Sequence, residues 1–411
     1  MQTYGWDTIS LVRQEKINSE LLHTWGSYNS GFNYPVGENA GRLSGEFGPW
    51  QVVEGGGGKL LRMSIPIYSG EMVLNDNVYD LCGLEAIIDI TLSLIPQGNT
   101  SLLQTRYDEF AKDESEIPDD NKGWIHPVKL NGDTSKLGVF AEVVLDNICY
   151  YLLAHPEQII LTFAEISLAK PECPDWLRPR SIKYSYLDTG YLCILAVCDD
   201  RSTADLPLEV DVSGLKSVSD SYFIIAPKLV LRNIILPCVC DLYTNASVSD
   251  FSVSDTGFSN KKDLEMHEIK SGAIYYTPIV YKDKNIGKIE GSNIKIEYDG
   301  YCNMYAGIDM FWDGYVKMDV SLSGNNTISF NKTDDDFNHD EDIPWYLKWL
   351  SPLVLAITEI VVAIISDDLI DKIEDQGGSI NANGINTVEW FREEENICDA
   401  YLNESLILQY S

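Results

Sequence analysis

The segment from Pro344 to Glu374 reads PWYLKWLSPLVLAITEIVVAIISDDLIDKIE, and most of its residues are apolar. Apolar residues occupy most positions around each helical turn, so a helix formed here must be covered on most of its sides. Lys348, Pro352 and Glu359 interrupt the segment, and no uninterrupted apolar run reaches the roughly 18 residues of a membrane span. We therefore expect a helix that is buried in the protein or lines a groove, and not one that crosses a bilayer.

Long alternating segments can supply the cover for such a helix. Glu85 to Pro96 alternates apolar and polar residues, which predicts a strand of roughly 40 Å at about 3.3 Å per residue. Lys59 to Ser69 alternates in the same way after the glycines Gly55 to Gly58, and this pattern predicts a hairpin with a glycine tip. Strands of this length indicate a large sheet.

The second half of the chain is also rich in strand-like segments. Between Glu268 and Phe330, turn signals at Asp313-Gly314 and Gly324-Asn325 separate β-rich runs, and connections this short predict antiparallel order. The acidic run from Asp334 to Asp342 then predicts a solvated loop before the last helix. Calcium binding by this run stays open, although the run lacks the glycine and the terminal glutamate of an EF-hand loop.

Three further segments have helical spacing. Arg13 to Trp25 and Leu137 to Ala154 each place apolar residues on one face. Leu229 to Tyr243 reads as a helix that is interrupted at Pro237, because proline removes a backbone donor and clashes with the preceding turn.

These elements predict an α+β fold of elongated shape, in which long and highly curved antiparallel sheets wrap around long apolar helices. The chain is long enough for more than one domain. We expect two halves, residues 1–205 and 206–411, with their boundary between Asp199 and Ser221. We leave open that the two halves share one continuous architecture.

The composition excludes several classes of protein. The chain carries 63 acidic and 30 basic side chains, a formal net charge of −33, which excludes nucleic acid as a partner because phosphate binding needs a clustered positive face. The 9 cysteines are scattered and partly placed in apolar runs, which predicts buried thiols in a reducing compartment. The first residues lack the basic segment and the apolar run of a secretory signal, so we expect no signal peptide.

Motifs of common enzyme families are absent from the sequence. It contains no Gly-x-x-x-x-Gly-Lys-Ser/Thr loop, no Gly-x-Gly-x-x-Gly, no Gly-x-Ser-x-Gly and no His-Glu-x-x-His. Cys238 and Cys240 lack a second pair of ligands nearby, so a buried structural role is favoured over zinc. We therefore expect a protein that is not an enzyme and that holds neither a metal nor a cofactor.

The long apolar faces are the candidate binding surface. An apolar ligand in a groove between sheet and helix would contact these side chains: Leu61, Met63, Ile65, Ile88, Ile90 and Leu92 on strands, and Phe140, Val144, Ile148, Leu353, Ile357, Ile360 and Ile364 on helices. The alternative is that these faces fill one another, as in a close-packed core. Trp345 and Trp349 are candidates for an aromatic anchor at a membrane interface, with core packing as their alternative.

Four short motifs resemble one family of proteins. They are Tyr4-Gly5-Trp6-Asp7-Thr8, the run WQVVEGGGG from Trp50 to Gly58, Phe163-Ala164, and Trp176-Leu177-x-Pro179. They are similar to motifs of the clostridial forty-seven-kilodalton protein family, which is encoded beside neurotoxins in orfX-type gene clusters. The resemblance runs over essentially the whole chain. It implies the fold of the tubular lipid-binding (TULIP) superfamily, a highly curved antiparallel sheet around a long helix.

The resemblance also implies a role. It suggests a non-catalytic accessory protein of a neurotoxin gene cluster, made in the bacterial cytoplasm without a signal peptide; its release with the toxin stays open. The implied partners are lipids or membranes and other proteins of the toxin cluster. No functional residues are carried over from the family.

Two functions therefore compete. The first is a binder of lipid or another apolar ligand, and the second is an assembly scaffold for toxin-complex partners with a filled core. A net charge of −33 disfavours docking to anionic lipid and favours partners with basic patches, and this repulsion weakens as the pH falls toward the isoelectric point near 4.3. A continuous apolar tunnel through the protein would favour the lipid binder. Apolar faces that pack closely against one another would favour the assembly scaffold.

Overall fold

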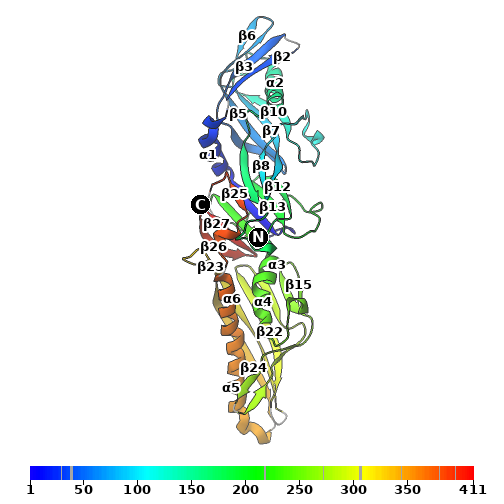
Figure 1. Ribbon diagram of the computed structural model, residues 1–411, viewed down its shortest axis with the longest axis vertical. Coiled ribbons are helices and arrows are strands. Elements are labelled where there is room, and N and C mark those ends of the chain that lie inside the picture. The colour runs from blue at the N-terminus through cyan, green and yellow to red at the C-terminus, as the bar shows by residue number, and fades with distance from the viewer. Residues whose placement is uncertain are drawn as a thin grey trace.

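The computed structural model describes residues 1–28, 30–37, 40–216, 219–271, 273–304, 308–343, 345–378, 380–393 and 395–411. The molecule is elongated, with one largely antiparallel sheet toward each end and a third sheet between them (Figure 1). Both chain termini lie at this middle sheet. The expected combination of antiparallel sheets, a few helices and an elongated shape is confirmed.

The upper sheet in Figure 1 is built on β7 (Glu85–Gln97), the strand that the alternation predicts. β7 pairs antiparallel with β5 (Leu60–Leu74), and β4 (Gln51–Gly57) pairs with β5, which confirms the predicted hairpin. Gly55 to Gly58 all have positive φ, a backbone conformation that other residues rarely adopt. The remaining strands of this sheet are β2 (Gly31–Val36), β3 (Gly41–Phe47), β6 (Asn77–Asp80), β8 (Thr100–Thr105), β9 (Glu109–Phe110), β10 (Trp124–Asn131), β11 (Thr162–Ser167) and β25 (Val388–Trp390).

The middle sheet joins strands from distant parts of the sequence. Its order is β12 (Ser181–Leu187), β13 (Tyr191–Val197), β1 (Thr8–Arg13), β14 (Ser221–Ile225), β27 (Ser405–Tyr410) and β26 (Ile397–Asn403). Every neighbouring pair in this order is antiparallel. The division into residues 1–205 and 206–411 stays a prediction, and this sheet is a hydrogen-bonded link across it.

The lower sheet is dominated by the long strands β22 (Asn293–Asn303), β23 (Asp309–Leu322) and β24 (Ile328–Asp342). β23 pairs antiparallel with both of its neighbours. The shorter strands of this sheet are β15 (Phe251–Val253), β16 (Gly257–Asn260), β17 (Leu264–Glu265), β20 (Ile279–Val280) and β21 (Ile286–Glu290), and β18 (Ile269–Ser271) and β19 (Ile274–Tyr276) form a separate pair.

The predicted helices are present. The two helices of the first half are α1 (Gln14–Thr24) and α2 (Phe140–Ala154). In the second half, α3 (Pro227–Val230) continues through a π-helical turn, Leu231–Ile235, into α4 (Leu236–Cys240). The last helix begins with a 3₁₀ segment (Trp345–Leu350) and consists of α5 (Ser351–Ala363), a π-helical turn (Ile364–Asp368) and α6 (Leu369–Gly378), followed by the short α7 (Ala382–Ile385).

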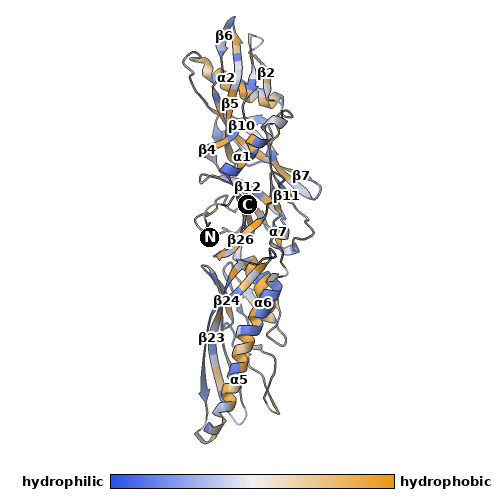
Figure 2. Ribbon diagram, turned by 90° about the vertical axis from the view of Figure 1, so that its left-hand side faces the viewer, coloured by the Kyte–Doolittle hydropathy of each residue, from blue (hydrophilic) through white to orange (hydrophobic). Residues whose placement is uncertain are grey.

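One face of the helix formed by α5 and α6 is buried against the lower sheet. Its buried residues recur three or four positions apart, the spacing of a single helix face: Val354, Ile357, Val361, Ile365, Leu369 and Ile373. They share one apolar cluster with Ile296 of β22, Val316 of β23 and Phe330 of β24. Figure 2 shows this helix beside β23 and β24 at one end of the molecule. Burial against these strands explains why the most apolar segment of the sequence is a helix at this position.

The turn predicted at Asp313-Gly314 is wrong, because both residues lie within β23. Gly314 pairs with Phe337 of β24. A Cβ atom on Gly314 would lie only 2.3 Å from the Phe337 ring, so the missing side chain makes room for that ring. Glycine here therefore marks a close cross-strand contact rather than a turn, whereas the turn at Gly324-Asn325 is confirmed.

The loop predicted from Asp334 to Asp342 is also wrong. This run forms the second half of β24 and pairs with β23. Its backbone is therefore bonded to a neighbouring strand, while nearly all of its side chains are half-exposed or exposed to water. Lys317 of β23 lies 3.6 Å from the Asp334 carboxylate and offsets part of the charge.

The sequence predicts that Pro237 interrupts its helix. In the structure the helix continues through this residue. The helix widens just before the proline into the π-helical turn, in which the Leu236 N–H bonds to the carbonyl of Leu231. A wider turn accommodates a residue that has no N–H and whose ring would otherwise crowd the preceding turn.

We expect Gly314→Ala to lower the stability of the lower sheet by about 1 to 3 kcal/mol, because the new Cβ displaces the Phe337 ring or the strand. The midpoint of urea unfolding measures this change. Gly324→Ala is the matched control, since a Cβ there meets no atom within 4 Å. Equal midpoints for the two variants would contradict the close contact.

Candidate functional site

The candidate groove residues of the upper half come together in one packed cluster. Helix α2 lies against β2, β7 and β10, and these candidates are buried in the apolar cluster that α2 shares with the upper sheet: Leu61, Met63, Ile65, Ile88, Ile90, Leu92, Val144 and Ile148. Phe140 is half-buried at the edge of the cluster, with its ring 5.4 Å from that of Tyr79. The Tyr151 hydroxyl donates to the Gly31 carbonyl at 2.8 Å and holds α2 against β2. These side chains pack closely against one another.

The candidates on the last helix are placed differently. Ile357 is buried, Leu353 and Ile364 are half-buried, and Ile360 is 37% exposed. The buried face includes Thr358, whose hydroxyl donates to the Val354 carbonyl at 3.0 Å and lies 2.9 Å from the Met310 sulfur. This back-bonded hydroxyl is satisfied inside the core. Of the four predicted residues, only Ile357 lies on this buried face, and the other three lie beside it.

The aromatic candidates Trp345 and Trp349 belong to the 3₁₀ segment that precedes α5. Their side chains lie outside the part of the chain that the structure describes. The interfacial anchor therefore stays a prediction.

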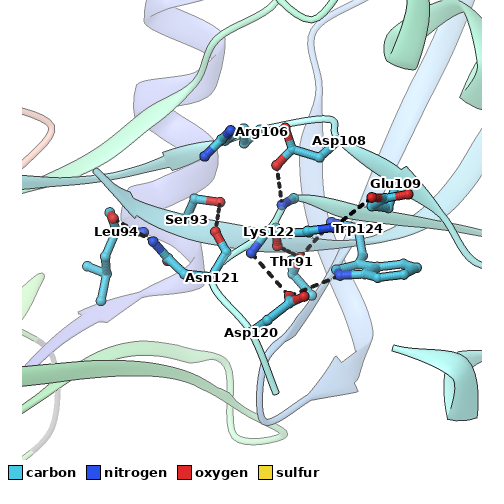
Figure 3. Close-up of polar contacts among 11 residues, drawn as sticks. Thr91, Ser93, Leu94, Arg106, Asp108, Glu109, Asp120, Asn121, Lys122 and Trp124 are labelled. Atoms are coloured by element: carbon cyan, nitrogen blue, oxygen red, sulfur yellow. Dashed lines mark hydrogen bonds and ion pairs between the residues drawn. The ribbon is translucent and has the colours of Figure 1, made fainter. Parts of the chain in front are cut away.

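The polar face of β7 is covered by the segment that leads into β10 (Figure 3). Thr91 donates to the Lys122 carbonyl at 2.8 Å and accepts from the Trp124 N–H at 2.7 Å. The Asn121 side chain bonds to both the N–H and the carbonyl of Leu94, each at 2.8 Å, as a neighbouring strand would. Because these donors and acceptors satisfy each other, we interpret the network as structural rather than catalytic.

A pocket of about 640 Å³ lies beside the middle sheet, and the motif Tyr4 to Asp7 forms part of its wall. The buried Asp7 carboxylate accepts from the Arg201 guanidinium at 2.7 Å and from the Cys198 backbone N–H at 2.7 Å. The Trp6 indole N–H donates to the Pro207 carbonyl at 2.8 Å. The remaining wall mixes apolar and charged residues: Leu206, Ala226, Pro227, Ile289, Lys228, Asp255 and Glu290.

A second groove, of about 530 Å³, lies between α5 and the acidic half of β24. The helix contributes apolar side chains, among them Leu355, which is 44% exposed, and the strand contributes Phe337. Four carboxylates also line it: Asp335, Asp336, Glu359 and Asp367. We call this surface the α5–β24 groove.

One end of the α5–β24 groove is closed by polar contacts. Lys332 lies 2.9 Å from Asp335 and 3.1 Å from Asp367, and the Ser366 hydroxyl donates to Asp335 at 2.8 Å. The hydrogen bond from Lys332 lowers the pKa of the Asp335 carboxyl, with a smaller contribution from Ser366. These contacts fasten the π-helical turn Ile364–Asp368 to β24. In the described part of the chain, Asp336 and Glu359 form no ion pair.

The cysteine pair has no features of a metal site. The Cys238 thiol contacts the carbonyls of Ile234 and Lys372, and burial raises the pKa of Cys238 and of Cys240 to about 11. These thiols are therefore protonated at neutral pH and are poor metal ligands. Among the described residues, no group of three His, Cys, Asp or Glu side chains is arranged to hold a metal ion.

Comparison with known proteins identifies the family. A sequence model of the OrfX-like family, described as Protein OrfX2/OrfX3/P47, matches residues 3–383. The chain belongs to the OrfX-like family. The match spans the lower sheet and the helix formed by α5 and α6, and it ends before β25, β26 and β27.

Individual members of the OrfX-like family confirm the fold. Protein P47 of Clostridium botulinum is 25% identical over 345 residues, which cover 81% of this chain and 79% of P47. Protein OrfX3 of Paraclostridium bifermentans is 23% identical over 333 residues, covering 73% of this chain and 64% of OrfX3. The solved structure of P47 from Clostridium botulinum A2 superposes with a TM-score of 0.76 at 21% identity, over 100% of this chain and 98% of P47.

Within the described residues, no helix combines the length and the apolar composition that crossing a bilayer requires. Sequence reasoning did not find the α5–β24 groove as a site. Its acidic residues were interpreted as a loop, and its apolar residues were distributed over a helix that was expected to be covered. A signal was present in Glu359, a charge in the middle of an apolar helix that must face water or a polar partner.

The filled cluster in the upper half makes a direct prediction. Ile90→Ala removes a fully buried side chain of β7, and we expect it to lower the free energy of unfolding by about 3 kcal/mol, because the neighbours cannot close the cavity. Leu22→Ala on α1, where the side chain is 59% exposed, is the control and costs little. Urea unfolding measures both variants. A loss below about 1 kcal/mol for Ile90→Ala would mean that the residue lines an open groove.

Proposed function

We propose that this chain is a non-catalytic accessory protein of a clostridial-type neurotoxin gene cluster and that it works by binding other proteins of that cluster. Membership of the OrfX-like family supports the connection to such clusters. Synthesis in the bacterial cytoplasm and release with the toxin are parts of the same proposal.

The proposal rests on the close packing of the apolar side chains that α2 shares with the upper sheet. An apolar carrier needs a cavity that remains open in the absence of its ligand, and pockets for such ligands have volumes of about 300 to 1,000 Å³. The residues expected to line the upper part of that cavity are buried against each other instead. Because these side chains fill the space between them, the packing favours binding at the surface of the protein.

The charge of the surface supports the same conclusion. A formal net charge of −33 repels anionic lipid and attracts proteins with basic patches. The carboxylates protonate as the pH falls, so repulsion between this chain and other acidic proteins or anionic membranes weakens. Association with acidic partner proteins or anionic membranes that strengthens under mild acid is therefore part of the proposal.

A second candidate function is the binding of a lipid or another apolar ligand. The pocket of about 640 Å³ beside the middle sheet favours it, since Leu206, Ala226 and Ile289 give it an apolar wall. A TULIP-like arrangement, in which the sheets curve around the long helices, belongs to this candidate. We rank it second because charged residues share the wall of the pocket.

The experiment that separates the two functions uses the full chain purified from its expression host. We expect native mass spectrometry to find no stoichiometric lipid, and size-exclusion chromatography to find a complex with at least one purified protein of the same gene cluster. A complex with an acidic partner should strengthen from about pH 7.5 to about pH 5, as the carboxylates begin to protonate, whereas a complex held by basic side chains of the partner should not. Bound lipid without any protein complex over this pH range would contradict the proposal and favour the second candidate.

A further inference from the structure

The α5–β24 groove is an apolar surface that its own protein does not cover. Leu355 of α5 is 44% exposed, and Val362 and Ala363 line the same side of the groove. Phe337 of β24 lies on the opposite side, held over Gly314. Water in contact with these side chains is released when an apolar partner occupies the groove, which favours binding.

The charges around the groove restrict what that partner can be. Glu359 faces the groove and forms no ion pair with any residue that the structure describes. Lys332 is shared between Asp335 and Asp367, and His339 lies on the strand side of the groove. A neutral apolar ligand would remove the Glu359 carboxylate from water without compensation, which is costly. An anionic lipid or a second copy of this acidic chain would add repulsion. A partner that combines apolar and basic side chains satisfies both requirements.

The shape of the groove indicates a helix as the form of the partner. The groove follows α5 from Leu355 to Asp367 and is bounded on its other side by a strand. Figure 2 shows the helix and the hairpin of β23 and β24 lying lengthwise beside each other. A volume of about 530 Å³ accepts a few side chains rather than a folded domain. An amphipathic helix presents such side chains at positions i, i+3 or i+4, and i+7.

We propose that the α5–β24 groove binds a basic amphipathic helix of a partner protein. The apolar side chains of that helix would contact Leu355, Val362 and Phe337, and its lysine or arginine side chains would pair with Glu359. This inference rests on the proposed function, since it names the class of partner segment and the surface that receives it. The contacts at Lys332 mark the closed end of the site.

The test uses a short synthetic amphipathic helix of leucine and lysine, labelled with a fluorophore, as the probe for the full chain. We expect saturable binding in fluorescence anisotropy that weakens with added salt. Glu359→Lys should weaken binding at least about tenfold, because it reverses the unpaired charge that faces the groove. Leu355→Ser should also weaken binding, which separates the apolar contribution from the charge.

Two controls exclude general attraction to an acidic protein. Glu209→Lys makes the same change of charge at an exposed residue outside the groove and should leave binding almost unchanged. A matched helix of leucine and glutamate should not bind. Equal weakening by Glu359→Lys and Glu209→Lys, or equal binding of both peptides, would overturn the proposed site. Circular dichroism and thermal unfolding of each variant identify loss of the fold, in which case Leu355→Ser alone decides the outcome.

The proposed function and the proposed site fail in different ways. If purified proteins of the gene cluster bind the wild-type chain and the Glu359→Lys variant equally, partner binding stands and the groove is not its site. If the leucine–lysine helix binds in the groove but no protein of the cluster forms a complex, the groove stands and the proposed function fails.

Discussion

The lower half of the molecule depends on the burial of one face of the helix formed by α5 and α6. Ile357, Val361 and Ile365 lie in the same apolar cluster as the inner side chains of β22, β23 and β24. Burial of a large aliphatic side chain contributes about 1.5 to 3 kcal/mol, so six such residues on one face contribute enough to keep the helix on the sheet. The opposite face has no such cover, and Leu355 and Ile360 remain partly exposed there.

Only one face of this helix is covered by the sheet. A protein whose apolar cores are closely packed can therefore still have a binding surface. In the upper half, α2 and the sheet cover each other's apolar faces, so candidates such as Ile90 and Ile148 are inaccessible to a ligand. In the lower half, the outer side of α5 meets the acidic half of β24, so apolar and negatively charged side chains share one groove. Function is therefore expected at an outer edge of the elongated molecule, consistent with a chain whose net charge favours basic protein partners.

Much of the fold was predictable, because long elements have strong local periodicity. Glu85 to Pro96 and Leu137 to Ala154 could be assigned from apolar spacing alone, and both are present as β7 and α2. The errors concern residues whose conformation is set by distant partners. Gly314 lies within a strand because of Phe337, and the acidic run extends β24 because β23 supplies hydrogen bonds. The α5–β24 groove could not be predicted, since it exists only where those two elements meet.

The most direct test of this account compares two isoleucines three positions apart on α5. Ile357 is fully buried against the sheet, and Ile360 is 37% exposed on the other side. The account predicts that Ile357→Ala lowers the free energy of unfolding by about 3 kcal/mol and that Ile360→Ala lowers it by less than about 1 kcal/mol. Equal losses in urea unfolding would mean that both faces of the helix are covered, and would contradict the one-sided packing on which the binding surface depends.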